Sequence, residues 1–158
     1  MATTSTVKRS PRAPDAIALL RADHKHVSEL FAAYEGTRSV PQKRTLVAQI
    51  CTELTVHAQV EEEIFYPAVK AALKDKELVP EASVEHATLK ALISQIKGVE
   101  PGDEMFEARV TVLAEYVKHH VKEEQNEMFA KAKASNLDMA ALGSQLAARK
   151  QELLAAAG

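Results

Sequence analysis

The pattern His-x-x-x-Glu occurs in two segments of this chain, as His57-Ala58-Gln59-Val60-Glu61 and as His120-Val121-Lys122-Glu123-Glu124. On a helix, side chains four residues apart lie on the same face, so each segment presents one imidazole and one carboxylate to the same neighbour. Nitrogen and oxygen ligands of this kind suit iron and similar transition metals. Two such pairs that face each other across a helical bundle could hold a pair of metal ions.

Both pairs lie within apolar stripes whose spacing of three and four residues predicts amphipathic helices. One helix should run from just after Val40 to near Leu73, and the other from the turn and cap at 101–103 to about Asn136. The first stripe consists of Leu46, Val47, Ile50, Leu54, His57, Glu61, Ile64 and Ala68. The second consists of Phe106, Val110, Leu113, Val117, His120, Glu124 and Met128.

Two further helices complete the predicted bundle. One should begin at Asp15, as its cap, and stop at Gly36, with His24 on its stripe. The other should open around Pro80 and close at Gly98, with His86 on its stripe. Short first and third connections make each linked pair of helices antiparallel. The sequence therefore predicts an all-α fold, an up-down-up-down four-helix bundle over 15–136.

The two ends of the chain lie outside the predicted bundle. Residues 1–14 are short, Ser/Thr-rich and interrupted by proline, so we expect a disordered tail there. Residues 137–158 should form an additional C-terminal amphipathic helix through Leu142, Leu146 and Leu153. Docking on its own bundle is the usual outcome for such a helix. We therefore expect a monomer, with a dimer through 137–157 as the alternative.

Composition narrows the function classes. The chain has 158 residues, 4% aromatics, a formal charge of −2 and one cysteine, Cys51. That near-neutral charge, with no phosphate-binding loop or dense basic face, argues against a nucleic-acid partner. No apolar run approaches the roughly 18 residues of a membrane span. A single cysteine allows no internal disulfide, and a cytoplasmic location fits.

Six polar residues occupy apolar stripe positions, and this is the central observation for function. Taken singly, each histidine is more often a hydrogen-bonded core residue than a ligand. However, a core with two glutamates must pair them, hydrate them or bind cations, because burying an unpartnered carboxylate costs several kcal/mol. The candidate metal ligands are His24, His57, Glu61, His86, His120 and Glu124.

The second His-x-x-x-Glu segment has two possible registers. His119 with Glu123 matches the spacing as well, but His120 and Glu124 align better with Leu113 and Val117. We therefore predict that His119 flanks the site. His26 lies about 200° around the helix from His24 and should face solvent.

With these residues in place, the chain resembles the hemerythrin-like, HHE cation-binding family. The matching pieces are Asp23-His24, residues 57–67, Glu85-His86 and residues 119–129. The resemblance covers about residues 15–134 and implies a bundle that holds two non-heme iron ions with an oxo or hydroxo bridge. By the resemblance, Glu61 and Glu124 bridge the irons, His24 and His57 bind one, and His86 and His120 bind the other.

The chain departs from the oxygen-carrying members of that family at two positions. Lys90 stands where they have a second third-helix histidine, and Glu124 stands where they have a shorter carboxylate one residue further along. A water or a tyrosine could fill the gap, with Tyr116 the first candidate and Tyr34 and Tyr66 weaker ones. Glu53 and Glu127 are candidates to accept an imidazole N–H.

The open position favours reaction with a small molecule over a sealed structural site. The main hypothesis is a di-iron protein that binds or reacts with O₂, peroxide or NO. If the protein is an enzyme, we expect its substrate to be peroxide or NO. Iron storage or buffering, or oxygen binding without catalysis, is the alternative. A metal-free helical bundle that presents 137–157 to a partner is the third.

Overall fold

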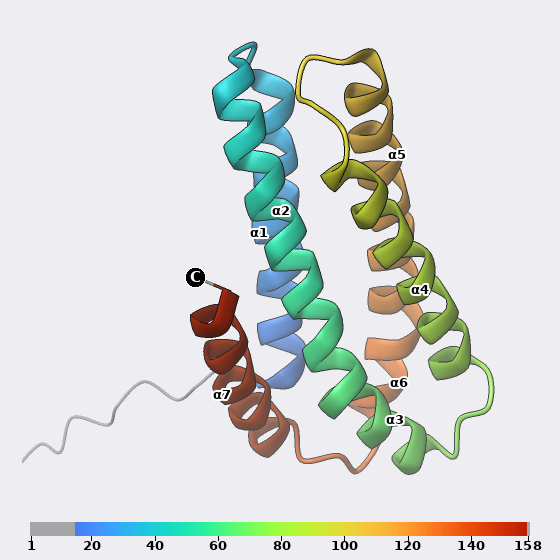
Figure 1. The fold of residues 1–158 in the computed structure, drawn as a ribbon. Helices are drawn as coiled ribbons and strands as arrows, with labels where there is room; N and C mark the ends of the chain where they lie inside the picture. The colour runs from blue at the N-terminus through green and yellow to red at the C-terminus, as the bar shows by residue number, and fades with distance from the viewer. Residues whose placement is uncertain (1–14, 158) are drawn as a thin grey trace, which may run out of the picture.

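The computed structural model describes residues 15–157, so the tail expected at 1–14 lies outside the described residues. All regular structure within that range is helical (Figure 1). The elements in chain order are α1 (Ala16–Gly36), α2 (Val40–Val60), η1 (Glu61–Phe65), α3 (Tyr66–Leu73), α4 (Leu78–Lys97), α5 (Glu104–Glu123), η2 (Glu124–Met128), α6 (Phe129–Ala134) and α7 (Met139–Ala157). The predicted all-helical fold class is confirmed.

Four helical columns form the bundle: α1, α2 continuing through η1 into α3, α4, and α5 continuing through η2 into α6. Helix α1 packs on α2, and α4 packs on α5, as the short connections predict. Helix α7 lies along the outside of α1 and α2 (Figure 1). The C-terminal helix therefore docks on its own bundle. Within the described range, no helix is both long and apolar enough to span a membrane.

Side-chain caps determine where several helices begin. Asp15 accepts a hydrogen bond from the backbone N–H of Ala18 at 2.8 Å, and Asp103 accepts one from Met105 at 2.8 Å. Each satisfies an N–H group that has no partner within its helix. Both caps are as the sequence predicts.

Helix α4 begins at Leu78, two residues before the predicted opening at Pro80. Asp75 accepts hydrogen bonds from the N–H groups of Leu78 at 3.2 Å and Val79 at 2.8 Å. Pro80 falls in the first turn, where its missing N–H costs no intrahelical bond. Proline is therefore tolerated inside this helix rather than marking its start.

Two π-helical turns, η1 and η2, interrupt the second and fourth columns, and the sequence patterns did not predict them. Each begins at a glutamate of the His-x-x-x-Glu pattern. The N–H of Tyr66 donates to the carbonyl of Glu61, and the N–H of Phe129 donates to that of Glu124. Such turns insert one extra residue and are frequent at functional sites. In η1, Pro67 contributes by lacking an N–H for a regular α-helical bond.

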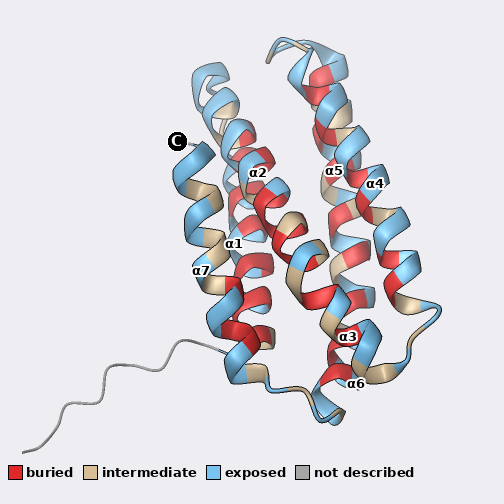
Figure 2. Cartoon of the chain, turned by 60° about the horizontal axis from the view of Figure 1, so that its bottom comes forward, coloured by how far each residue is buried: buried red, intermediate tan, exposed pale blue. Residues whose placement is uncertain are grey.

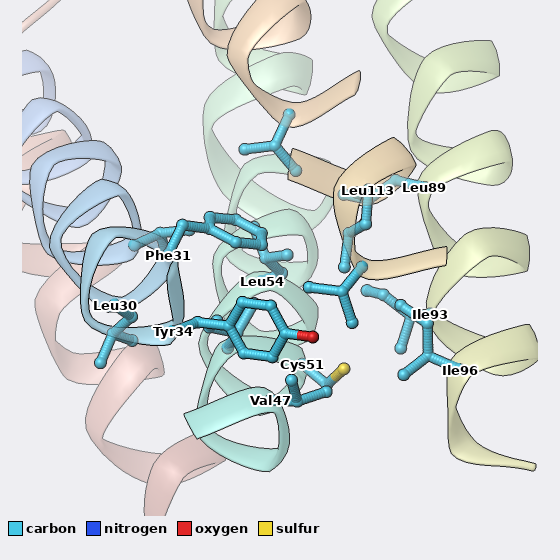
Figure 3. Packing of buried hydrophobic residues seen from close by; sticks show 14 of the residues in the cluster. Leu30, Phe31, Tyr34, Val47, Cys51, Leu54, Leu89, Ile93, Ile96 and Leu113 are labelled. Carbon is cyan, nitrogen blue, oxygen red and sulfur yellow. The ribbon is translucent and has the colours of Figure 1, made fainter. Parts of the chain in front are cut away.

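The apolar core has two parts, one on either side of a polar layer. One part includes Val27, Leu54, Leu89 and Val117 and extends toward the α1–α2 connection (Figure 3). The other, at the opposite end, includes Leu20, Phe65, Phe129 and Leu146 of α7. Buried residues line the inner faces of the columns (Figure 2). The six candidate ligands lie between the two parts, so an apolar environment surrounds them.

Candidate metal centre

The structure brings all six candidate residues together. Nε2 of His57 lies 2.9 Å from Oε1 of Glu61, and Nε2 of His86 lies 3.6 Å from the same oxygen. Around Glu124, Nε2 of His24 lies 3.3 Å from Oε1 and Nε2 of His120 lies 3.4 Å from Oε2. The Nε2 atoms of His24 and His57 are 3.1 Å apart. Four helical columns thus aim nitrogen and oxygen donors at one small volume.

These donors form two overlapping groups whose potential ligand atoms lie within 4.8 Å of one another. One group contains Glu61, His86, His120 and Glu124, and the other contains His24, His57 and Glu124. Glu124 belongs to both. This sharing is the geometry expected of a carboxylate between two cation positions.

Burial makes the cluster costly without a cation. Glu61 is 0% exposed and Glu124 is 3% exposed. Both oxygens of Glu61, Oε1 of Glu124 and Nε2 of His120 are buried and make no hydrogen bond of acceptable geometry. Unpartnered buried polar atoms cost about 1–3 kcal/mol each. A bound cation would satisfy these lone pairs, so the donor set fits a transition metal.

Carboxylates outside the cluster orient two of the imidazoles. Nδ1 of His57 donates to Oδ2 of Asp23 at 3.0 Å, and Nδ1 of His120 donates to Oε2 of Glu85 at 2.9 Å. Each bond leaves the Nε2 lone pair directed at the cluster. The side-chain amide of Gln125 lies 2.9 Å from Nδ1 of His24.

Glu53 and Glu127, which the sequence offered for this role with a surface position as the more frequent explanation, do not contact the candidate ligands. Oε1 of Glu53 lies 3.8 Å from His26, and Glu127 is exposed. The acceptors instead come from the helix opposite each His-x-x-x-Glu segment. Asp23 and Glu85 each directly precede a candidate histidine, a position that the matched Asp23-His24 and Glu85-His86 pairs could have indicated.

The carboxylates of the cluster favour protonated imidazoles, and a cation would compete with those protons. Burial would lower the pKa of His57, but the Glu61 carboxylate and the hydrogen bond to Asp23 raise it well above its usual value. Burial acts likewise on His120, where contact with Glu124 raises the pKa to about 9. Burial would raise the pKa of Glu124, but the imidazoles of His120 and His24 hold it well below its usual range. Metal binding at this cluster would therefore release protons.

Comparison with known proteins agrees with this geometry. Residues 15–132 match the family model of the hemerythrin HHE cation binding domain. This chain belongs to that family. The HHE match covers all six candidate residues together with Asp23 and Glu85.

Two relatives illustrate the range of proteins that carry an HHE-like segment. A solved structure of a hemerythrin HHE cation binding domain-containing protein from Mycobacterium kansasii superposes with a TM-score of 0.78 at 22% identity, covering 91% of this chain and 90% of that one. It supports the fold alone. A Nostoc protein named DNA nickase is 33% identical over 112 residues, which is 71% of this chain. The match spans 32% of the Nostoc protein, about a third of its length.

Tyr66 is the tyrosine whose hydroxyl contacts the candidate ligands of this HHE domain. Its hydroxyl donates to Oε2 of Glu124 at 2.5 Å and lies 3.1 Å from Nε2 of His86. The sequence ranked Tyr116 first, but the Tyr116 hydroxyl donates to the backbone carbonyl of Glu85 at 3.4 Å. Tyr34 donates to Glu107, away from the cluster. Residue spacing on a regular helix did not show that the π-helical turn rotates Tyr66 inward.

Lys90 lies outside the cluster of six candidate ligands. Its ammonium donates to Glu62 at 2.8 and 3.0 Å, and its side chain is 52% exposed. The position that carries a histidine in the oxygen carriers is therefore a surface ion pair here. His26 and His119 are exposed, and His119 pairs with Glu123 at 3.4 Å. The choice of His120 with Glu124 over the neighbouring register thus agrees with the burial.

A small cavity adjoins the cluster on the side of the core part that contains Val27 and Leu54. All four candidate histidines line it, with apolar side chains that include Val27, Leu54, Leu89 and Val117. It leaves about 20 Å³ for the centre of a water-sized molecule. A space of that size suits one water or one molecule of similar size.

Proposed function

We propose that this HHE domain holds two non-heme iron ions and binds or reacts with a small oxidant or diatomic: O₂, peroxide or NO. Glu61 and Glu124 would bridge the irons. His24 and His57 would bind one iron, and His86 and His120 the other. The observation that carries the proposal is the closely spaced set of unpartnered buried donors beside an apolar cavity of about 20 Å³.

The cavity supports the choice of substrate class. Its lining, apart from the histidines, Asp23 and Tyr116, is aliphatic, so it offers little to an extended polar substrate. A molecule of two to four atoms matches its size. Iron would supply redox and Lewis-acid chemistry at the edge of this cavity. The surrounding side chains exclude bulk water, which strengthens electrostatic interactions at the site.

Tyr66 would hold a proton beside the metal centre, where its hydroxyl contacts Glu124 and His86. Burial and the nearby Glu61 and Glu124 carboxylates raise the pKa of its phenol well above the usual value. The phenol therefore stays protonated near neutral pH and remains a hydrogen-bond donor. Its hydroxyl, 3.1 Å from Nε2 of His86, lies at the half of the cluster that lacks the second third-helix histidine.

Elemental analysis and an optical spectrum of protein expressed with ample iron test the proposal. We expect about two irons per chain and visible absorption from the bridged pair. Absence of stoichiometric iron would refute it. His57→Ala and Glu61→Ala should lose most of the metal, whereas exposed His26→Ala should retain it. Equal loss in all three would refute the assigned ligands.

A peroxide assay separates reaction from storage. Steady O₂ release from peroxide by the iron-loaded protein supports a catalytic role, whereas inert, exchangeable iron supports storage or buffering. The metal-free alternative is disfavoured because it leaves both Glu61 oxygens buried without a hydrogen bond. We do not propose nickase activity from the name of the Nostoc relative, because about two thirds of that protein lies outside the match.

A further inference from the structure

The two helical hairpins of the bundle repeat the same arrangement around the cluster. In one, Asp23 of α1 accepts a hydrogen bond from His57 of α2. In the other, Glu85 of α4 accepts one from His120 of α5. The halves differ in what contacts the outer oxygen of the accepting carboxylate.

Helix α7 supplies a cation to only one of these carboxylates. Nζ of Lys150 lies 2.5 Å from Oδ1 of Asp23, while Oδ2 of Asp23 accepts the proton of His57 Nδ1 at 3.0 Å. A continuous chain of contacts therefore runs from α7 through α1 to a candidate ligand on α2. Among the ion pairs of residues 15–157, Glu85 has His120 as its partner and no lysine or arginine.

Lys150 occupies the bundle-facing side of α7. It follows Leu142 and Leu146 at spacings of four residues, and both leucines are buried in the core. A lysine in this line carries its methylene stem over apolar surface and places its ammonium at a polar partner. Here the partner is Asp23, whose side chain is 7% exposed, against 23% for Glu85. Glu85 has more access to water, whereas Asp23 depends on Lys150.

We propose that Lys150 is a positioning residue for the metal centre: by fixing Asp23, it holds the His57 imidazole in the orientation that aims Nε2 at the cluster. The inference rests on the proposed metal centre. Helix α7 then helps to orient a metal ligand, in addition to packing on α1 and α2. The two metal positions are also unequal, because only the His24/His57 half depends on α7.

Loss of the ammonium should release one metal position and leave the other. Without Lys150, Oδ1 of Asp23 is buried with no partner, so the carboxylate no longer has one fixed orientation. Removing a group that orients a ligand typically costs about 10–100-fold in metal affinity. Because Lys150 acts through Asp23, we expect about 10-fold faster loss of one metal ion to a chelator.

Three variants of the full chain, each loaded with iron, test the inference by the kinetics of iron release to a chelator. Lys150→Met keeps the stem and removes the charge, and Lys150→Arg keeps a charge. Arg149→Gln is the matched control, because Arg149 helps to fasten α7 through Glu63 at 2.8 Å and does not contact Asp23. Circular dichroism and a thermal melt verify that each variant is folded.

The expected result is two release phases in the methionine variant, with one accelerated, and near wild-type release in the arginine and Arg149→Gln variants. Unchanged release in Lys150→Met would overturn the inference, as would equal acceleration in Lys150→Met and Arg149→Gln, which would point to docking of α7. Equal acceleration in the methionine and arginine variants would also overturn it. Wild-type protein that binds no iron would instead refute the proposed metal centre.

Discussion

Asp23 binds His57 from the opposite helix, with the imidazole Nδ1 donating to the carboxylate at 3.0 Å. Glu85 and His120 repeat the relationship at 2.9 Å. In both halves the orienting carboxylate directly precedes a candidate ligand of its own helix, His24 or His86. Each hairpin therefore fixes one imidazole, His57 or His120, through a contact between its two helices rather than within one helix.

Removing the Glu85 carboxylate should weaken metal retention without unfolding the domain. In Glu85→Ala, Nδ1 of His120 loses its acceptor, so the ring can rotate. We expect a loss of about 10–100-fold in metal affinity, measured by competition with a chelator. Glu53→Ala is the control, since Glu53 contacts His26 only at 3.8 Å. A similar loss in the control would show that local charge, and not orientation, sets the affinity.

Replacing Tyr66 by phenylalanine should change the centre while preserving its packing. Tyr66 is buried, and phenylalanine keeps its ring and removes only the hydroxyl, so the side chain still fills the same space. The lost hydrogen bond to Glu124 should lower the free energy of unfolding of the metal-free protein by about 1.5–3 kcal/mol. The visible spectrum of the iron-loaded protein should shift, whereas Tyr116→Phe should leave it unchanged. An unaltered Tyr66→Phe spectrum would remove the phenol from the centre.

The apolar stripes predicted the bundle and the six clustered residues because both depend on helical periodicity. His120 and Glu124 could be chosen over His119 and Glu123 since only one register continues the stripe of Leu113 and Val117. Burial of the chosen pair and exposure of His119 agree with that choice. Their role as metal ligands stays a prediction that metal analysis will test.

Three features escaped the sequence patterns, for two physical reasons. The inward position of Tyr66 depends on a π-helical turn, which changes the angular spacing that a regular helix would give. The roles of Asp23 and Lys150 depend on which helix lies opposite, and a single helix pattern carries no such information. One feature of the sequence did indicate Lys150: it follows Leu146 by four residues, on the same face of the helix as Leu142 and Leu146.

Narrowing the cavity should slow the proposed reaction with peroxide but leave the proposed metal ions in place. Val121 lines the small cavity and also the groove of about 520 Å³ between α1 and α5, so it lies between the cluster and the surface. In Val121→Phe, the larger ring would obstruct this passage. We expect wild-type iron content with a lower rate of peroxide consumption, measured as O₂ release. Exposed Val112→Phe is the control, because Val112 is 49% exposed and lines neither space. A wild-type rate in Val121→Phe would locate the route of entry elsewhere.

The cap at the start of α4 should make part of the stability depend on acid. Although partial burial works against it, the N–H groups of Val79 and Leu78 hold the pKa of Asp75 below its usual range. The folded state therefore binds the proton less readily than the unfolded state. The stabilising contribution of the Asp75 carboxylate is complete above the unfolded pKa near 3.8 and disappears as the pH falls through the lower folded value.

At neutral pH, Asp75→Ala should lower the free energy of unfolding by about 1 kcal/mol, measured by urea denaturation. Asp75→Asn, which keeps an acceptor but does not titrate, should lose less, and its difference from wild type should shrink in acid. A difference that stays constant from pH 7 to about pH 3 would show that the carboxylate charge contributes nothing to the cap.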